Sequence, residues 1–146
     1  MRIAITVPAI LAVILSAATV QAEEFEVKML NKGEKGTMVF EPDLVMAQPG
    51  DTVRFVPTDK GHNVESIDGM LPEGVEAFKS KPNDEFVLTL GAEGAYGVKC
   101  TPHYGLGMVA LVVAGEPVNL EEAMEVKQKG KAKKRFKEIF EAYEAQ

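Results

Sequence analysis

The chain's only cysteine lies in the short segment CTPHYGLGM, together with a methionine and one of the two histidines. Two residues separate Cys100 from His103, and four separate His103 from Met108; the second histidine, His62, lies upstream in GHNVESI. A thiolate, two imidazoles and a weak axial thioether suit a metal that alternates between Cu(I) and Cu(II) in a trigonal site. Zinc is less suited, because it usually takes four strong ligands or keeps an open position for water.

Each of these residues also has an ordinary structural explanation. A single buried cysteine or methionine is often part of a hydrophobic core, and a single histidine is often structural or exposed. The joint pattern is more specific, because the chain's whole supply of cysteine and histidine can converge on one point. It therefore favours a metal site.

Composition limits what can surround this site. The 146 residues are 46% hydrophobic, which predicts a single compact domain. With 22 acidic and 16 basic side chains the net charge is −6, which disfavours a general nucleic-acid binder. One cysteine allows no disulfide within the chain, and two histidines allow no cluster of several metal sites.

The first residues have the pattern of a secretory signal peptide. Arg2 precedes an apolar stretch from Ile3 to Leu15, and small residues end the segment at Ala22. An uncleaved membrane anchor is the less favoured alternative, because Pro8 interrupts the stretch and it is short for a bilayer. We predict a signal peptide over residues 1–22 and an exported domain over residues 23–146. A metal bound to Cys100 would explain an unpaired thiol in an oxidising compartment.

Residues 23–115 predict an all-β sandwich or barrel. Short β-rich runs alternate with turn residues such as Asn31-Lys32-Gly33. The eight expected strands are FEVKML, TMVF, LVMA, DTVRFVPT, HNVESI, EFVLTL, AYGVKC and MVALVVA. The last run is almost wholly apolar, as in a strand buried on both faces. The segment CTPHYGLGM is therefore expected to be a loop between the last two strands.

Residues 119–146 predict two helices. Asn119 and Glu122 have the spacing of a capping box before a short helix from Leu120 to Lys127, which we expect Gly130 to end. The second helix has one apolar face, which is expected to pack on the sandwich. That face contains Ala132, Phe136, Ile139, Phe140 and Tyr143.

Together the motifs GHNVESI and YGVKCTPHYGLGM resemble the cupredoxins, and the resemblance extends from EEFEVKML to the C-terminal helices. It implies a mainly β fold, an eight-stranded Greek-key β-sandwich or barrel over about residues 23–115, with two C-terminal α-helices, as in one branch of that family. The ligands carried over for one copper ion per chain are His62, Cys100, His103 and Met108. Leu106 departs from the family, where a second methionine is common; the change alters the apolar surroundings of His103 and no ligand.

Geometry and family also suggest how neighbouring residues support these ligands. Asn63 is expected to donate its backbone N–H to the Cys100 sulfur and to hold Thr101 with its side chain. Pro57 and Pro102 are expected to keep the copper pocket stiff and dry, although both can also be ordinary turn residues.

The resemblance further implies a periplasmic one-electron carrier and not an enzyme. It implies copper nitrite reductase as an acceptor in denitrification, and a c-type cytochrome as donor or alternative acceptor. We expect a monomer without nucleic-acid contacts and, once the signal peptide is removed, without membrane contacts. Two other classes of copper protein are less favoured. A copper enzyme would need a further histidine cluster, and a periplasmic copper-delivery protein would be favoured by a methionine cluster, whereas the seven methionines are dispersed.

Lysines are predicted to surround an apolar docking face near His103. Lys60 lies two residues before His62, and strand alternation points the Lys99 side chain away from the metal. The resemblance places three further lysines at the same end, Lys32, Lys79 and Lys81. The alternative is a set of ordinary solvated lysines.

Overall fold

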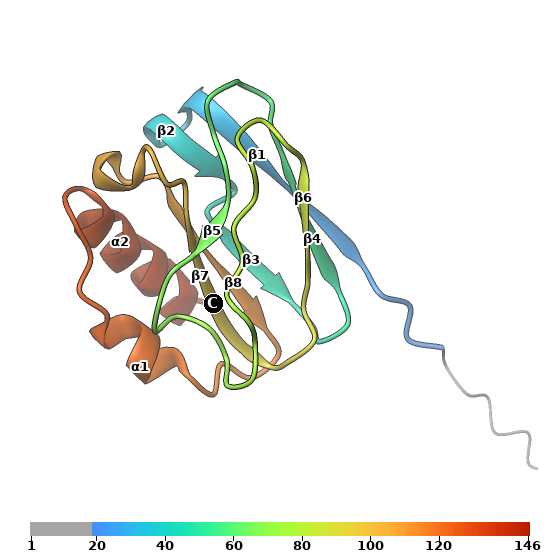
Figure 1. Ribbon diagram of the computed structural model, residues 1–146. Helices are drawn as coiled ribbons and strands as arrows, with labels where there is room; N and C mark the ends of the chain where they lie inside the picture. The colour runs from blue at the N-terminus through green and yellow to red at the C-terminus, as the bar shows by residue number, and fades with distance from the viewer. Residues whose placement is uncertain (1–18) are drawn as a thin grey trace, which may run out of the picture.

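The computed structural model describes residues 19–146, so the predicted signal peptide lies almost wholly outside the described residues. Two four-stranded sheets form a sandwich, in the orders β2-β1-β4-β6 and β3-β8-β7-β5 (Figure 1). The strands are β1 (Glu24–Gly33), β2 (Gly36–Glu41), β3 (Leu44–Ala47), β4 (Thr52–Val56), β5 (Glu65–Ser66), β6 (Phe86–Thr89), β7 (Gly94–Lys99) and β8 (Val109–Ala114). The pairs β1–β4 and β3–β8 are parallel, and the other neighbours are antiparallel. The mainly β prediction is confirmed.

The core lies between the two sheets. Alternate residues of β1 and β4 point inward, so that Val27, Val53 and Phe55 are fully buried, and they meet Tyr96 and Val112 from the other sheet. Complete burial of such a side chain contributes roughly 1.5–3 kcal/mol. The opposite face of the first sheet carries charged side chains.

Strand β8 is buried on both faces, as its apolar sequence predicts. Ala110 and Val112 face the core between the sheets, whereas Leu111 and Val113 belong to a second apolar cluster beneath the helices. The loop that carries Cys100, His103 and Met108 ends where β8 begins. That end of the loop is therefore attached to one of the most buried strands in the described chain.

Two helices, α1 (Leu120–Glu125) and α2 (Ala132–Glu144), lie on the same side of the sandwich, beside β7 and β8 (Figure 1). Phe136, Ile139 and Phe140 of α2 are buried against the second apolar cluster, which confirms the predicted face. None of the helices within residues 19–146 is long and apolar enough to cross a membrane.

The predicted capping box at α1 is wrong. Asn119 makes no side-chain cap; its Oδ1 accepts the Ala95 N–H at 2.6 Å and its Nδ2 donates to the Ala95 carbonyl at 2.9 Å. The side chain thus satisfies two backbone groups of β7 in place of the helix end. The helix also ends at Glu125, where Val126 turns extended, before Gly130 is reached.

Two strand predictions also need correction. Only Glu65 and Ser66 of HNVESI form a strand, so His62 and Asn63 lie in irregular chain. The expected turn at Asn31-Lys32-Gly33 is part of β1, because Gly33 pairs with Gly36 and the hairpin turns at Glu34 and Lys35.

Candidate metal centre

The loop from Cys100 to Met108 is closed by its own backbone. The Cys100 N–H donates to the Met108 carbonyl at 3.0 Å, and the Met108 N–H donates to the His103 carbonyl at 3.2 Å. A short 3₁₀ helix, Tyr104–Leu106, forms the tip. Cys100 and Met108 are fully buried in the core cluster, whereas His103 is half-buried. The loop therefore holds two buried sulfur side chains below one partly accessible imidazole.

Three donor atoms converge below this loop. The Cys100 Sγ lies 3.7 Å from the His62 Nδ1 and 3.5 Å from the His103 Nδ1, and the two Nδ1 atoms lie 3.1 Å apart. Among the described residues these three side chains form the one His/Cys/Asp/Glu group whose donor atoms are near enough to share a metal ion. Met108 is not part of this group, but its side chain is buried in the same core cluster as Cys100.

The orientation of His62 is set by Asn31 on β1. The His62 Nε2 lies 2.8 Å from the Asn31 Oδ1. An amide oxygen only accepts hydrogen bonds, so Nε2 carries the proton and Nδ1 presents its lone pair to Cys100 and His103. The sequence carries no signal for this role, because Asn31 stands 31 positions before His62 and its local pattern predicts a turn.

Asn63 and Thr101 connect the segment that carries His62 with the segment that carries Cys100. The Thr101 N–H donates to the Asn63 Oδ1 at 2.7 Å, and the Asn63 Nδ2 donates to the Thr101 Oγ1 at 2.8 Å. The Asn63 backbone N–H acts on Cys100 as a donor that lowers the pKa of its thiol. The expected contact between the Asn63 side chain and Thr101 is present. Pro57 directly follows β4, and Pro102 lies exposed in the turn after Thr101.

Burial favours the uncharged forms of the Cys100 thiol and the His62 imidazole. It raises the pKa of the Cys100 thiol, and hydrogen bonds from the backbone N–H groups of Asn63 and His103 oppose that rise. Burial also lowers the pKa of His62; His103 lowers it further and Asp59 acts in the opposite direction. A neutral imidazole is the form that binds a metal, and a bound metal would replace the thiol proton.

The linker between α1 and α2 supports the tip of the ligand loop. The Tyr104 hydroxyl donates to the Gln128 Oε1 at 2.5 Å, and the Lys131 N–H donates to the Gly105 carbonyl at 3.0 Å. Gly130 lies so close that a Cβ there would be 2.5 Å from the Gly105 oxygen. The sequence contained no signal for these contacts beyond the glycine itself.

The five lysines proposed for docking differ in their surroundings. Lys32, Lys60 and Lys81 are exposed. Lys79 and Lys99 lie 3.9 and 4.0 Å from the same Glu65 oxygen, and the Lys99 Nζ also lies 5.0 Å from the centre of the Tyr104 ring. Leu106, whose N–H donates to the His103 carbonyl at 3.0 Å, is an apolar residue with 49% exposure.

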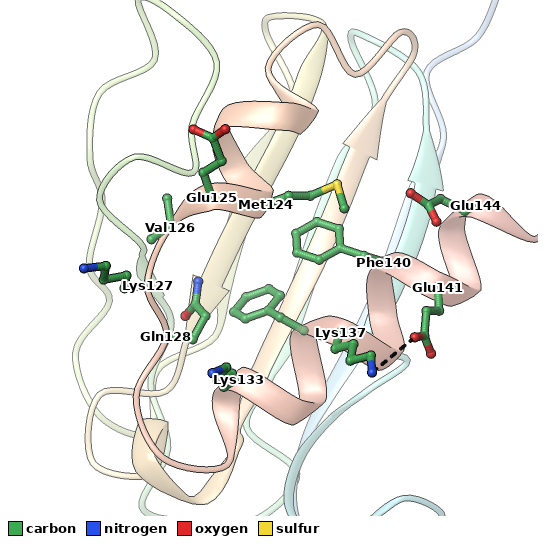
Figure 2. Close-up of a pocket in the computed structure, with 11 residues that line it drawn as sticks. Met124, Glu125, Val126, Lys127, Gln128, Lys133, Lys137, Phe140, Glu141 and Glu144 are labelled. Carbon is green, nitrogen blue, oxygen red and sulfur yellow. Dashed lines mark ion pairs between the residues drawn. The ribbon is translucent and has the colours of Figure 1, made fainter.

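A groove elsewhere on the protein is lined by neither cysteine nor histidine. It runs between α1 and α2, where Figure 2 shows the Phe140 ring beside Met124, and charged side chains form its rim. The Lys137–Glu141 ion pair of 3.9 Å lies on that rim. Among the described residues, the cysteine and the two histidines gather at the loop end of the sandwich, away from this groove.

A two-sheet sandwich with a His–Cys–His cluster below the loop before its last strand defines the class of the cupredoxins. Residues 27–115 match the family model of copper binding proteins, plastocyanin/azurin family. The chain is 56% identical over 126 residues to pseudoazurin from Paracoccus pantotrophus, covering 86% of this chain and 87% of that protein. It is 51% identical over 120 residues to pseudoazurin from Methylorubrum extorquens, covering 82% and 81%.

Solved structures show the same likeness. The crystal structure of pseudoazurin from Methylobacterium extorquens AM1 has a TM-score of 0.79 and 49% identity, covering 82% of this chain and 98% of that one. Pseudoazurin from Hyphomicrobium denitrificans has a TM-score of 0.75 and 51% identity, covering 78% and 93%. The chain belongs to the pseudoazurins, within the plastocyanin/azurin family. It is accordingly an electron-transfer cupredoxin and not an enzyme.

The residues present fit the copper of this family. A buried thiol, two imidazoles with Nδ1 atoms facing it and a buried thioether nearby form a soft donor set that both copper oxidation states tolerate.

Proposed function

We propose that the chain is a periplasmic carrier of single electrons that holds one copper ion through His62, Cys100, His103 and Met108. The observation that carries this proposal is the convergence of the Cys100 Sγ and the two Nδ1 atoms within hydrogen-bonding distances of one another. Copper bound there would supply a reversible change between Cu(I) and Cu(II).

Groups of the protein hold the proposed ligands in position. The Asn31 contact fixes the His62 ring, the Asn63–Thr101 pair fixes the segment next to Cys100, and the linker supports the loop tip. His103 is the half-buried member of the cluster and lies beside the exposed Leu106 side chain. We propose that electrons enter and leave through the His103 imidazole, within an apolar contact face.

The absorption spectrum of the copper-loaded protein tests the site. We expect an intense visible charge-transfer band with reversible redox behaviour, one copper ion per chain, and loss of the band in Cys100→Ala. Thr101→Ser, which retains the hydroxyl next to the same cysteine, should keep the band. A Cys100→Ala protein with an undiminished band would refute the ligand assignment, and colourless, readily exchanged Cu(I) would indicate copper delivery instead.

We further propose that docking involves an acidic redox partner. Copper nitrite reductase is the proposed acceptor, and a c-type cytochrome the proposed donor or alternative acceptor. Lysines 32, 60, 79, 81 and 99 would steer the encounter, which a small interface leaves reversible. Lys60→Ala and Lys99→Ala should slow bimolecular electron transfer at low ionic strength, and the loss should shrink as salt is added.

Stopped-flow rates with nitrite reductase over a salt series measure this effect. Lys133→Ala, which removes an exposed lysine from α2, is the matched control and should react at the wild-type rate. Equal electron-transfer rates for all variants, with no salt dependence in the wild type, would show that the five lysines are ordinary solvated residues without a role in docking.

Export is proposed from the first 22 residues. Mass spectrometry of the protein from a periplasmic extract should give a mature chain that begins at Glu23. A chain retaining residues 1–22 in the membrane fraction would contradict this proposal.

A further inference from the structure

Glu65 connects the lysine-rich surface with the segment that carries Cys100. It lies on β5 opposite Lys99 of β7 and forms an isolated bridge with Lys79 on its other side. Its Oε2 accepts the Thr101 hydroxyl hydrogen bond at 2.6 Å, and the Nζ atoms of Lys79 and Lys99 lie 3.9 and 4.0 Å from the same oxygen. The side chain is only 24% exposed, so these groups are its main surroundings.

The Thr101 hydroxyl has one proton, and the position of Glu65 decides where that proton points. A carboxylate only accepts hydrogen bonds, so the proton faces Glu65 and a lone pair of the same oxygen remains for the Asn63 Nδ2 at 2.8 Å. The Asn63 Oδ1 in turn accepts the Thr101 N–H at 2.7 Å. Both the oxygen and the nitrogen of the Asn63 side-chain amide are therefore held by Thr101, the residue that follows Cys100. The Asn63 backbone N–H is in turn the donor that lowers the pKa of the Cys100 thiol.

We propose that Glu65 is a positioning residue for the Cys100 sulfur, acting through the Thr101 hydroxyl and the Asn63 amide. The inference rests on the copper site proposed above. Hydrogen bonding around the cysteine sulfur tunes the potential of such a site. An N–H bonded to the thiolate withdraws electron density and favours Cu(I), so loosening Asn63 lowers the reduction potential.

Two variants separate this role from the charge of Glu65. Glu65→Gln removes the charge and keeps an oxygen that can accept from Thr101, whereas Glu65→Val removes both. Loss of the negative charge alone favours Cu(I) and raises the potential. We therefore expect a higher potential than wild type for Glu65→Gln, and a potential below that of Glu65→Gln for Glu65→Val. Glu116→Gln, with the same charge change beyond the far end of β8, should leave the potential unchanged.

A second measurement uses the metal-free protein. The Thr101 N–H, which donates to Asn63, should exchange with deuterium about fivefold faster in Glu65→Val than in Glu65→Gln, the factor expected when one ordinary hydrogen bond is lost. Circular dichroism establishes that both variants fold; Val suits a strand position.

Equal potentials and equal exchange rates in the two variants would overturn the inference and leave Glu65 as a charge only. Failure of the copper proposal looks different, because the wild type would then lack the visible band, while the exchange comparison would still decide the role of Glu65 in the metal-free protein.

Discussion

Replacing Gly130 with alanine tests whether the α1–α2 linker supports the ligand loop. Gly130 has a φ of +52°, and an added Cβ would lie 2.5 Å from the Gly105 oxygen and 3.2 Å from the Gly105 Cα. Because real Cβ contacts stay beyond 3.0 Å, linker and loop must separate by about half an ångström.

Two costs combine in this variant. A left-handed conformation costs a residue with a Cβ roughly 1–2 kcal/mol. Weakening the Lys131–Gly105 hydrogen bond, now 3.0 Å long, adds about 1 kcal/mol. We expect Gly130→Ala to reduce the free energy of unfolding by about 2–3 kcal/mol and to change the visible spectrum and reduction potential, because the displaced Gly105 lies two residues from His103.

Gly74→Ala is the matched control. Gly74 has a φ of +80° and nothing within 4 Å of an added Cβ, so the substitution introduces backbone strain without a new contact. Urea unfolding of the metal-free proteins gives the stability difference, and voltammetry of the loaded proteins gives the potentials. If Gly130→Ala lost no more stability than Gly74→Ala and kept the wild-type potential, the linker would be only a connection between helices.

Three further outcomes are expected. Met108→Gln should lower the reduction potential with copper retained, since Met108 is the proposed axial ligand and such a weak ligand mainly sets the relative stability of Cu(II). Voltammetry of this variant beside Met46→Gln, an exposed methionine, checks it. Burial raises the pKa of Tyr96, so its contribution to stability should be present below pH ~10 and lost as pH rises further; urea unfolding of Tyr96→Phe should show a smaller alkaline loss. In the metal-free protein Cys100, fully buried and with a raised thiol pKa, should react with a disulfide reagent far more slowly than after unfolding, and fast reaction in the folded state would contradict the described burial.

Local patterns predicted the elements in which one physical signal dominates. The apolar run of β8 and the helical spacing of Phe136, Ile139 and Phe140 both led to the observed burial. The close spacing of Cys100 and His103 predicted a shared loop, because few residues separate them. In each case the deciding interactions lie within a short stretch of chain.

Interactions between distant segments escaped prediction. Asn119 fits a helix cap by its local sequence, yet its amide bonds to the backbone of β7. Asn31 looked like a turn residue, and its contact with His62 depends on the pairing of β1 with its neighbours. Glu65 had no distinguishing pattern, since its Thr101 contact joins residues 36 positions apart. Such roles become visible only once the two sheets are in place.

The paired hydrogen bonds between Asn63 and Thr101 have a consequence for the energetics of metal uptake. They join two segments 38 positions apart through groups of the protein alone. Closing a loop of that length costs an unfolded chain about 3 kcal/mol in entropy. Folding of the sandwich closes this loop, so ion binding does not add this cost. Binding at the proposed copper site therefore need not bring these two segments together. We accordingly expect copper to be removable and replaceable while the sandwich stays folded.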